Sequence, residues 1–155
     1  MRILGFTKKW DKLKQAEFTT FRFPRKDKDW EVGEQVQIVY KPRSKEREML
    51  GIAKIINKEA RCMAWDGSKL TEPKITNEEA IADGFADGET KYIKSQLGYF
   101  FMWEFLWDYY SGVRLLNEPM NKLTLKWDYS FLGRSEDTFY RECIKVENEV
   151  PNNIR

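Results

Sequence analysis

Thr20 and Arg22 lie two residues apart in segment 17–23 (EFTTFRF), where hydroxyl and charged side chains alternate with phenylalanines. Side chains two apart in a β-strand project from the same face. Arginine offers a planar donor fork that suits phosphate, and a threonine hydroxyl can bond a phosphate oxygen or a base edge. The pair predicts a surface that binds a phosphate or a base. The alternative is an ordinary strand with one solvated face.

Basic side chains gather around this strand. Residues 1–54 hold 14 Lys or Arg against 8 Asp or Glu, whereas residues 55–155 hold 13 against 17. This asymmetry favours a polyanion partner for the first part of the chain, although a charged surface without a partner remains an alternative. An exposed ring beside such cations would stack an unpaired base. The residues expected to bind nucleic acid are Lys9, Lys12, Lys14, Thr20, Arg22, Arg25, Trp30, Lys41 and Arg43.

Several classes of chemistry are excluded or disfavoured by composition. The chain has no histidine, which removes catalysis by Ser-His-Asp or Cys-His sets and every zinc site that uses histidine. Cys62 and Cys143 lack the CxxC spacing of a metal site and are expected to be free thiols. Glu104 and Asp108 share a helix face, but no third ligand is visible, so a solvated stripe is favoured over a metal or acid–base site. We therefore expect no metal and no cofactor, and assign no catalytic residue.

The elements that position these residues follow from hydrophobic periodicity. A capping box at Thr76 and Glu79 starts a helix that ends at Gly84, and an interruption at Gly51 predicts a bulge. Short helical turns are expected at 8–15, and a long apolar helix, mostly enclosed by protein, at 89–112. Strands are predicted at 2–7, 17–23, 34–42, 49–65 and 121–131, with a further edge strand at 138–148.

These elements predict one α+β domain, a small β-barrel with flanking helices, spanning residues 1–132. Residues 133–155 would be a C-terminal extension of the same domain. The first residues contain too short an apolar run for a signal peptide, and the apolar helix is too short and too charged to span a membrane. A cytoplasmic protein is expected.

The order of elements and one short motif resemble the ASCH domain family of the PUA-like superfamily. The family signature G-x-K-x-x-T-x-R lies where an early helix meets the next strand. Thr20 and Arg22 match it, whereas Gln15 stands in place of the glycine and Glu17 in place of the lysine. The acidic helix ending in Gly84-Phe85 and the strand in 32–40 (VGEQVQIVY) also resemble the family pattern, over roughly residues 2–130.

The resemblance implies a PUA-like barrel and an RNA- or nucleotide-binding module with a basic cleft between the first helix and the barrel. Some ASCH proteins resemble amidohydrolases that act on acetylated cytidine, with the motif lysine and threonine and a distant glutamate as their proposed catalytic set. Thr20 is retained here and the lysine is not, so binding without catalysis is the main expectation; Lys14 is the nearest substitute amine in the sequence. A hydrolase of modified nucleosides or RNA is the alternative, and a protein-interaction module using exposed aromatic rings is a third.

Overall fold

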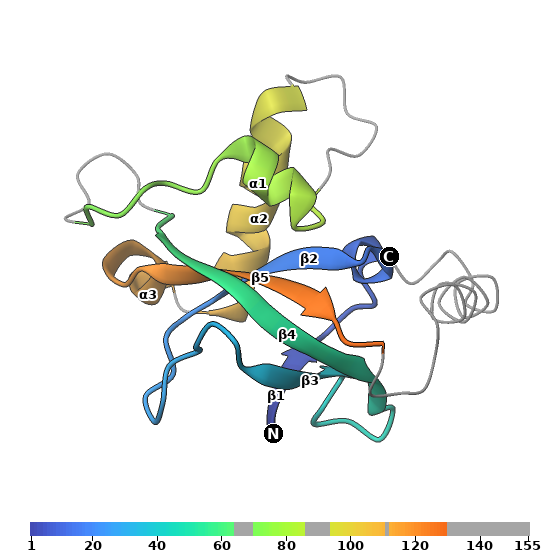
Figure 1. The fold of residues 1–155 in the computed structure, drawn as a ribbon. Coiled ribbons are helices and arrows are strands. Elements are labelled where there is room, and N and C mark those ends of the chain that lie inside the picture. The colour runs from blue at the N-terminus through green and yellow to red at the C-terminus, as the bar shows by residue number, and fades with distance from the viewer. Residues whose placement is uncertain (64–69, 86–93, 111, 130–155) are drawn as a thin grey trace.

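The computed structural model describes residues 1–63, 70–85, 94–110 and 112–129. The edge strand expected at 138–148, the extension 133–155 and Cys143 lie outside these residues. The described chain forms one curved, five-stranded sheet with helices packed along one side (Figure 1). The mixed α+β class is confirmed. No backbone ladder joins the two edge strands in the described chain, so closure into a barrel is not shown.

The sheet has the spatial order β1-β3-β4-β5-β2. The edge strand β1 runs parallel to β3, and every other neighbouring pair is antiparallel. The bulge expected at Gly51 is present, because the register shifts between Ile38 and Val39 opposite Gly51 and Met49. The strands are β1 (Arg2–Phe6), β2 (Glu17–Arg22), β3 (Gln35–Tyr40), β4 (Glu48–Arg61) and β5 (Met120–Trp127).

The helical elements are η1 (Asp11–Lys14), a 3-10 turn, followed by α1 (Asn77–Ala82), α2 (Lys94–Tyr109) and α3 (Gly112–Asn117). The predicted end of a helix at Gly112 is wrong: α2 stops at Tyr109, and Gly112 begins α3 instead. A Cβ at Gly112 would lie 2.2 Å from a ring carbon of Trp107, so the glycine allows a close approach to that ring rather than capping α2.

Two apolar layers hold the elements together. The concave side of the sheet buries one cluster, which includes Leu4, Phe18, Ile38, Ile55 and Leu125. A second cluster joins the ends of β2 and β5 to the helices and includes Phe21, Phe23, Met102, Leu106 and Met120. Each cluster joins residues from several elements that are far apart in sequence, so burial of apolar area fixes the tertiary arrangement.

The apolar helix is less enclosed than the sequence predicts. Met102 and Leu106 are buried against the sheet, but Trp107 is 44% exposed and Tyr109 is 54% exposed. Glu104 and Asp108 are both exposed, as expected for a solvated stripe. None of the helices in the described residues has the length and apolar character needed to span a bilayer.

Helix α1 begins and ends as its sequence predicts. The Thr76 hydroxyl accepts a hydrogen bond from the Glu79 amide, and the Glu79 carboxylate accepts one from the Thr76 amide, which completes the capping box. At the other end, the amides of Gly84 and Phe85 bond back to Ile81 and Ala80, as in a Schellman motif. Gly84 has φ +114°, and a Cβ there would lie 2.7 Å from Cε3 of Trp10.

Replacing Gly84 with alanine should therefore destabilise the fold more than the same change at Gly33. Gly33 also has a positive φ (+91°), but nothing lies within 4 Å of a Cβ built there. Both variants carry a backbone cost of about 1–3 kcal/mol, and only Gly84→Ala adds an overpacking cost of about 1–3 kcal/mol against Trp10. Urea unfolding of the two variants measures the difference. Equal losses would contradict the close contact between Gly84 and Trp10.

Candidate functional site

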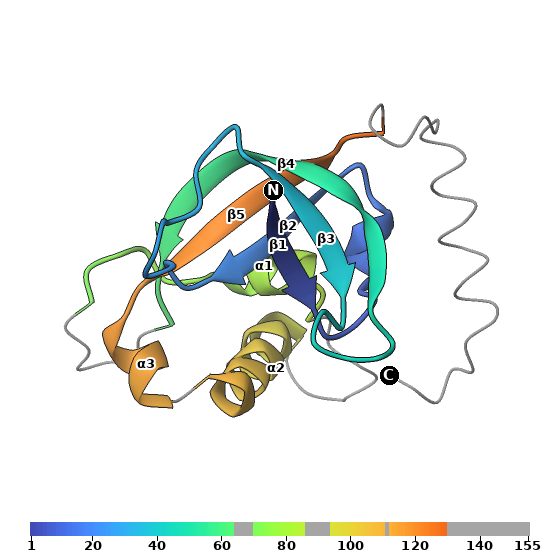
Figure 2. The same ribbon diagram turned by 90° about the horizontal axis from the view of Figure 1, so that it is seen from below.

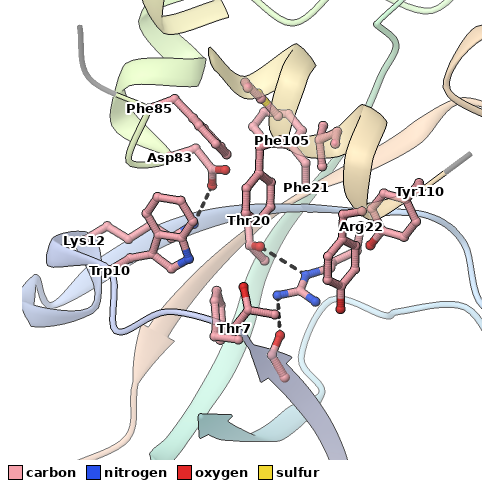
Figure 3. Close-up of a pocket in the computed structure, with 15 residues that line it drawn as sticks. Thr7, Trp10, Lys12, Thr20, Phe21, Arg22, Asp83, Phe85, Phe105 and Tyr110 are labelled. Atoms are coloured by element: carbon pink, nitrogen blue, oxygen red, sulfur yellow. Dashed lines mark hydrogen bonds and ion pairs between the residues drawn. The ribbon is translucent and has the colours of Figure 1, made fainter. Parts of the chain in front are cut away.

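A pocket lies where the two edge strands of the sheet approach each other under the helices (Figure 3). Its volume is about 50 Å³, enough for a few water molecules or one small polar group. Strands β1 and β2, the turn η1, the end of α1 and the helix α2 all contribute. The lining residues are Gly5, Phe6, Thr7, Trp10, Lys12, Thr20, Phe21, Arg22, Asp83, Phe85, Met102, Phe105, Leu106, Tyr109 and Tyr110.

A buried ion pair forms one end of the pocket. Nζ of Lys12 lies 2.6 Å from Oδ1 of Asp83, with side chains only 4% and 7% exposed. The same ammonium donates to the carbonyl oxygen of Thr19 at 2.7 Å. The turn η1 places Lys12, and the C-terminal end of α1 places Asp83. The pair therefore joins the turn before β2 to the end of α1, across a separation of 71 residues in the sequence.

Burial shifts both members of this pair toward their neutral forms. It lowers the pKa of the Lys12 ammonium, while the Asp83 carboxylate acts in the opposite direction. It raises the pKa of the Asp83 carboxyl, which Lys12 opposes. Whether the proton resides on the amine or on the carboxyl, the pair as a whole carries no net charge.

Arg22 forms the other end of the pocket and bridges the two edge strands. Its Nε donates to Oγ1 of Thr20 at 3.2 Å, and its Nη2 donates to the carbonyl oxygen of Gly5 in β1 at 2.7 Å. The guanidinium carbon lies 4.8 Å from the centre of the Phe6 ring. Among the described residues, none of the ion pairs involves Arg22. Its remaining N–H groups have no acceptor in that part of the chain.

The side chain of Arg22 is partly buried. Burial lowers its pKa, which Tyr110 and Asp83 oppose, yet an arginine in a protein stays charged. Since the Lys12–Asp83 pair is neutral overall, Arg22 gives the pocket a single positive charge. That arrangement favours an anion.

Aromatic rings form the wall between these two ends. Trp10 packs against Phe85 with ring centres 5.2 Å apart and against Phe105 at 5.7 Å. Tyr109 lies parallel to Phe105, at 6.0 Å and 7° between planes, and its exposed ring is part of the pocket lining. The pocket thus combines one cationic end, one neutral polar end and flat apolar surfaces.

Three of the nine predicted binding residues meet in this pocket, namely Lys12, Thr20 and Arg22. Lys9 instead pairs with Glu48 at 2.6 Å, and Arg25 pairs with Asp27 at 3.2 Å. The remaining four, Lys14, Trp30, Lys41 and Arg43, also lie outside the pocket lining.

Trp30 has no face free for a base. Its side chain is 4% exposed and packs in the core of the sheet, between the guanidinium groups of Arg2 and Arg25 at 4.5 and 5.4 Å from its ring centre. The stacking role proposed for it from the sequence is therefore not available in this conformation. Alternation and composition cannot distinguish a buried tryptophan from an exposed one.

The sequence analysis missed Asp83 and the aromatic wall. A signal for Asp83 was present, because a carboxylate at a helix C-terminus opposes the helix dipole and needs a reason in tertiary structure. Trp10 lies outside the densest apolar run and beside lysines, which is a signal for a ring near cations. The rings of Phe85, Phe105 and Tyr109 had no such signal. Their side chains converge only because η1 and α2 pack on the same end of the sheet.

No protein-family model matches the chain, and neither a curated protein nor a solved structure is significantly similar to it.

Removing Lys12 should destabilise the protein strongly at neutral pH and less in mild acid. Lys12→Met leaves the Asp83 carboxylate buried without its cation, a loss of about 3–5 kcal/mol. In an unfolded chain the pKa of an aspartate is about 4. Burial already raises the pKa of Asp83 in the folded protein, and loss of Lys12 raises it further. Between these two pKa values the folded variant binds more protons than the unfolded one, so its stability rises as pH falls. Chemical unfolding of both proteins at about pH 7.5 and about pH 5 measures this recovery.

The double variant Lys12→Met/Asp83→Leu is the control, because it keeps neither charge at this position. Its stability relative to wild type should not recover in acid. A loss in Lys12→Met that is the same at both pH values would mean that Asp83 does not depend on Lys12.

Proposed function

We propose that the chain binds RNA or a nucleotide in this pocket, with Arg22 holding a phosphate. The observation that carries the proposal is the Arg22 guanidinium, partly buried and with no carboxylate partner among the described residues, in a pocket walled by rings. A buried cation without a counter-charge is costly. An oxyanion ligand would offset that cost.

The free side of the Arg22 fork supports an oxyanion as the ligand. Thr20 and Gly5 engage Nε and Nη2 and so fix the plane of the guanidinium. The N–H groups that remain can form a bidentate contact with two oxygens of one phosphate or carboxylate. An arginine oriented in this way loses little rotamer entropy when the ligand binds.

The aromatic wall supports a nucleotide over a simple anion. Tyr109 lines the pocket beside the cation of Arg22 and is 54% exposed to solvent. Stacking of one base on such a ring contributes roughly 1–3 kcal/mol. The Thr20–Arg22 contact also lies at the positions that match the ASCH motif, and the open seam between β1 and β2 is compatible with a PUA-like barrel whose cleft takes the ligand.

Arg22→Lys should weaken binding of a labelled single-stranded RNA, because lysine keeps the charge but loses the fork. Loss of charge-assisted hydrogen bonds of about 1.5–3 kcal/mol corresponds to roughly a 10- to 100-fold weaker affinity. Arg22→Met should weaken it further. Fluorescence anisotropy at two salt concentrations measures these affinities, with circular dichroism to verify the fold.

Arg25→Gln is the matched control, because Arg25 is a cation outside the pocket lining, paired with Asp27 at 3.2 Å. It should leave the affinity for RNA nearly unchanged. Absence of binding at low salt, or equal affinities for wild type and both Arg22 variants, would reject the proposal. Salt-insensitive association with a protein instead would favour the third alternative from the sequence, a protein-interaction module.

A second candidate function is hydrolysis of a modified nucleoside, and Lys12 is the observation that favours it. The motif lysine is replaced by Glu17, which is exposed, but η1 supplies another amine to the same pocket. Burial lowers the pKa of Lys12, which favours the neutral amine that a general base requires. Lys14, the amine favoured from the sequence, lies outside the lining.

In such a reaction the Thr20 oxygen would attack an amide carbonyl of the ligand and pass its proton to Lys12. The C–N bond would then break, and Lys12 would return the proton to the leaving amine. Water would release the acyl group from Thr20 in a second step. Asp83 would hold the Lys12 side chain in position.

Thr20→Val should abolish turnover of an N-acylated nucleoside while the variant still binds mononucleotide, although more weakly, since Arg22 loses its bond to Thr20 but keeps its charge and its bond to Gly5. Chromatographic detection of the deacylated product, over a range of N-acyl nucleosides, measures this. Turnover that persists in Thr20→Val would exclude Thr20 as the nucleophile. No turnover by the wild type on any of them would leave the chain as a binding module.

A further inference from the structure

The hairpin loop that joins β3 to β4 packs against the edge strand that lines the pocket. The backbone amide of Lys41 donates to the carbonyl oxygen of Phe6 at 2.8 Å. A Cβ on Gly5 would lie 2.7 Å from Cγ of Pro42, so the proline ring rests directly on that residue. Gly5 and Phe6 both line the pocket. Figure 2 shows this loop beyond the C-terminal end of β1.

The two acidic residues of this hairpin are already neutralised. Glu46 accepts from Lys41 at 2.5 Å, and Glu48 pairs with Lys9 at 2.6 Å. Hydrogen bonding to Glu46 raises the pKa of Lys41, and the same bond lowers the pKa of Glu46. Each of the two hairpin carboxylates is therefore already paired with a lysine, Glu46 with Lys41 and Glu48 with Lys9.

Three further cations of the hairpin have no such partner. Arg43, Lys45 and Arg47 are exposed, and in the part of the chain that the structure describes none of the ion pairs involves them. The hairpin therefore keeps an excess of three positive charges next to β1. Lys8, which lies 5.0 Å above the ring of Trp10 in the pocket wall, adds another exposed cation near the same place.

We propose that Arg43, Lys45 and Arg47 form a phosphate-binding track that continues from the pocket, and that the ligand is a single-stranded polynucleotide. This rests on the proposed function: the phosphate of one nucleotide occupies the pocket on Arg22, its base lies outside against the exposed ring of Tyr109, and the phosphates next to it cross the hairpin. A mononucleotide would use the pocket alone and leave the excess charge of the hairpin unused. Exposed cations of this kind position a backbone without reading its sequence.

The track makes affinity depend on strand length and on salt. Each phosphate contact on a single strand adds about 0.7 to the slope of log K against log salt concentration. A mononucleotide should therefore show a shallow slope. An oligonucleotide of about eight residues should bind more tightly and with a slope that is steeper by about 2.

The double variant Arg43→Gln/Lys45→Gln tests the track. It should lower the slope for the oligonucleotide by about 1.4 and weaken its binding roughly 25-fold at about 0.1 M salt, with no change for the mononucleotide. The matched control is Lys54→Gln/Lys126→Gln. These two exposed lysines lie opposite each other on β4 and β5, so the control removes the same charge elsewhere. It should change neither ligand's affinity.

The outcomes separate the track from the pocket. If both double variants weaken oligonucleotide binding equally, or if neither does, the hairpin does not bind phosphates as proposed. The pocket proposal still stands in that case if the Arg22 variants lose affinity for the mononucleotide. If the mononucleotide fails to bind the wild type, or binds all Arg22 variants equally, the pocket proposal itself fails. RNA and DNA oligonucleotides of one sequence, tested in parallel, show whether the 2′-hydroxyl contributes at this site.

Discussion

The buried Lys12–Asp83 ion pair is the constraint on which the pocket depends. It lies at the meeting point of η1, β2 and the end of α1, and the ammonium also bonds the carbonyl oxygen of Thr19. A pair of this kind contributes little net stability compared with apolar residues of the same shape, but breaking it is costly. Because breaking the pair is costly, it favours the arrangement in which the end of α1 meets η1.

Arg22 completes this arrangement on the other side. It joins β2 to β1 through a side chain, at a place where the two edge strands exchange no ladder hydrogen bonds in the described chain. The same guanidinium thus has a structural contact with Gly5 and a free side toward the pocket. A fully hydrogen-bonded seam between these strands would close the space in which the pocket lies, so the open sheet and the candidate site have one origin.

Local features of the fold were predictable because they depend on neighbouring residues. The capping box at Thr76, the bulge at Gly51 and the alternation of β2 each follow from short-range chemistry. The site was only partly predictable. Thr20 and Arg22 share a strand, whereas Asp83 and the rings of α2 reach them through packing between distant segments. Similarly, the exposure of Trp107 and the burial of Trp30 are properties of the assembled fold, which sequence pattern alone does not determine.

The order of the strands has a consequence for synthesis of the protein. Among the described residues, strand β2, which carries Thr20 and Arg22, pairs with no strand except β5, and β5 ends at Trp127. While the ribosome is still adding residues before Met120, β2 therefore has no strand to pair with, although it was among the first parts of the chain to emerge. The pocket is completed only after β5 inserts between β4 and β2. A nascent chain that ends between Tyr110 and Met120 carries every residue of the pocket lining but lacks the strand that holds β2 in the sheet.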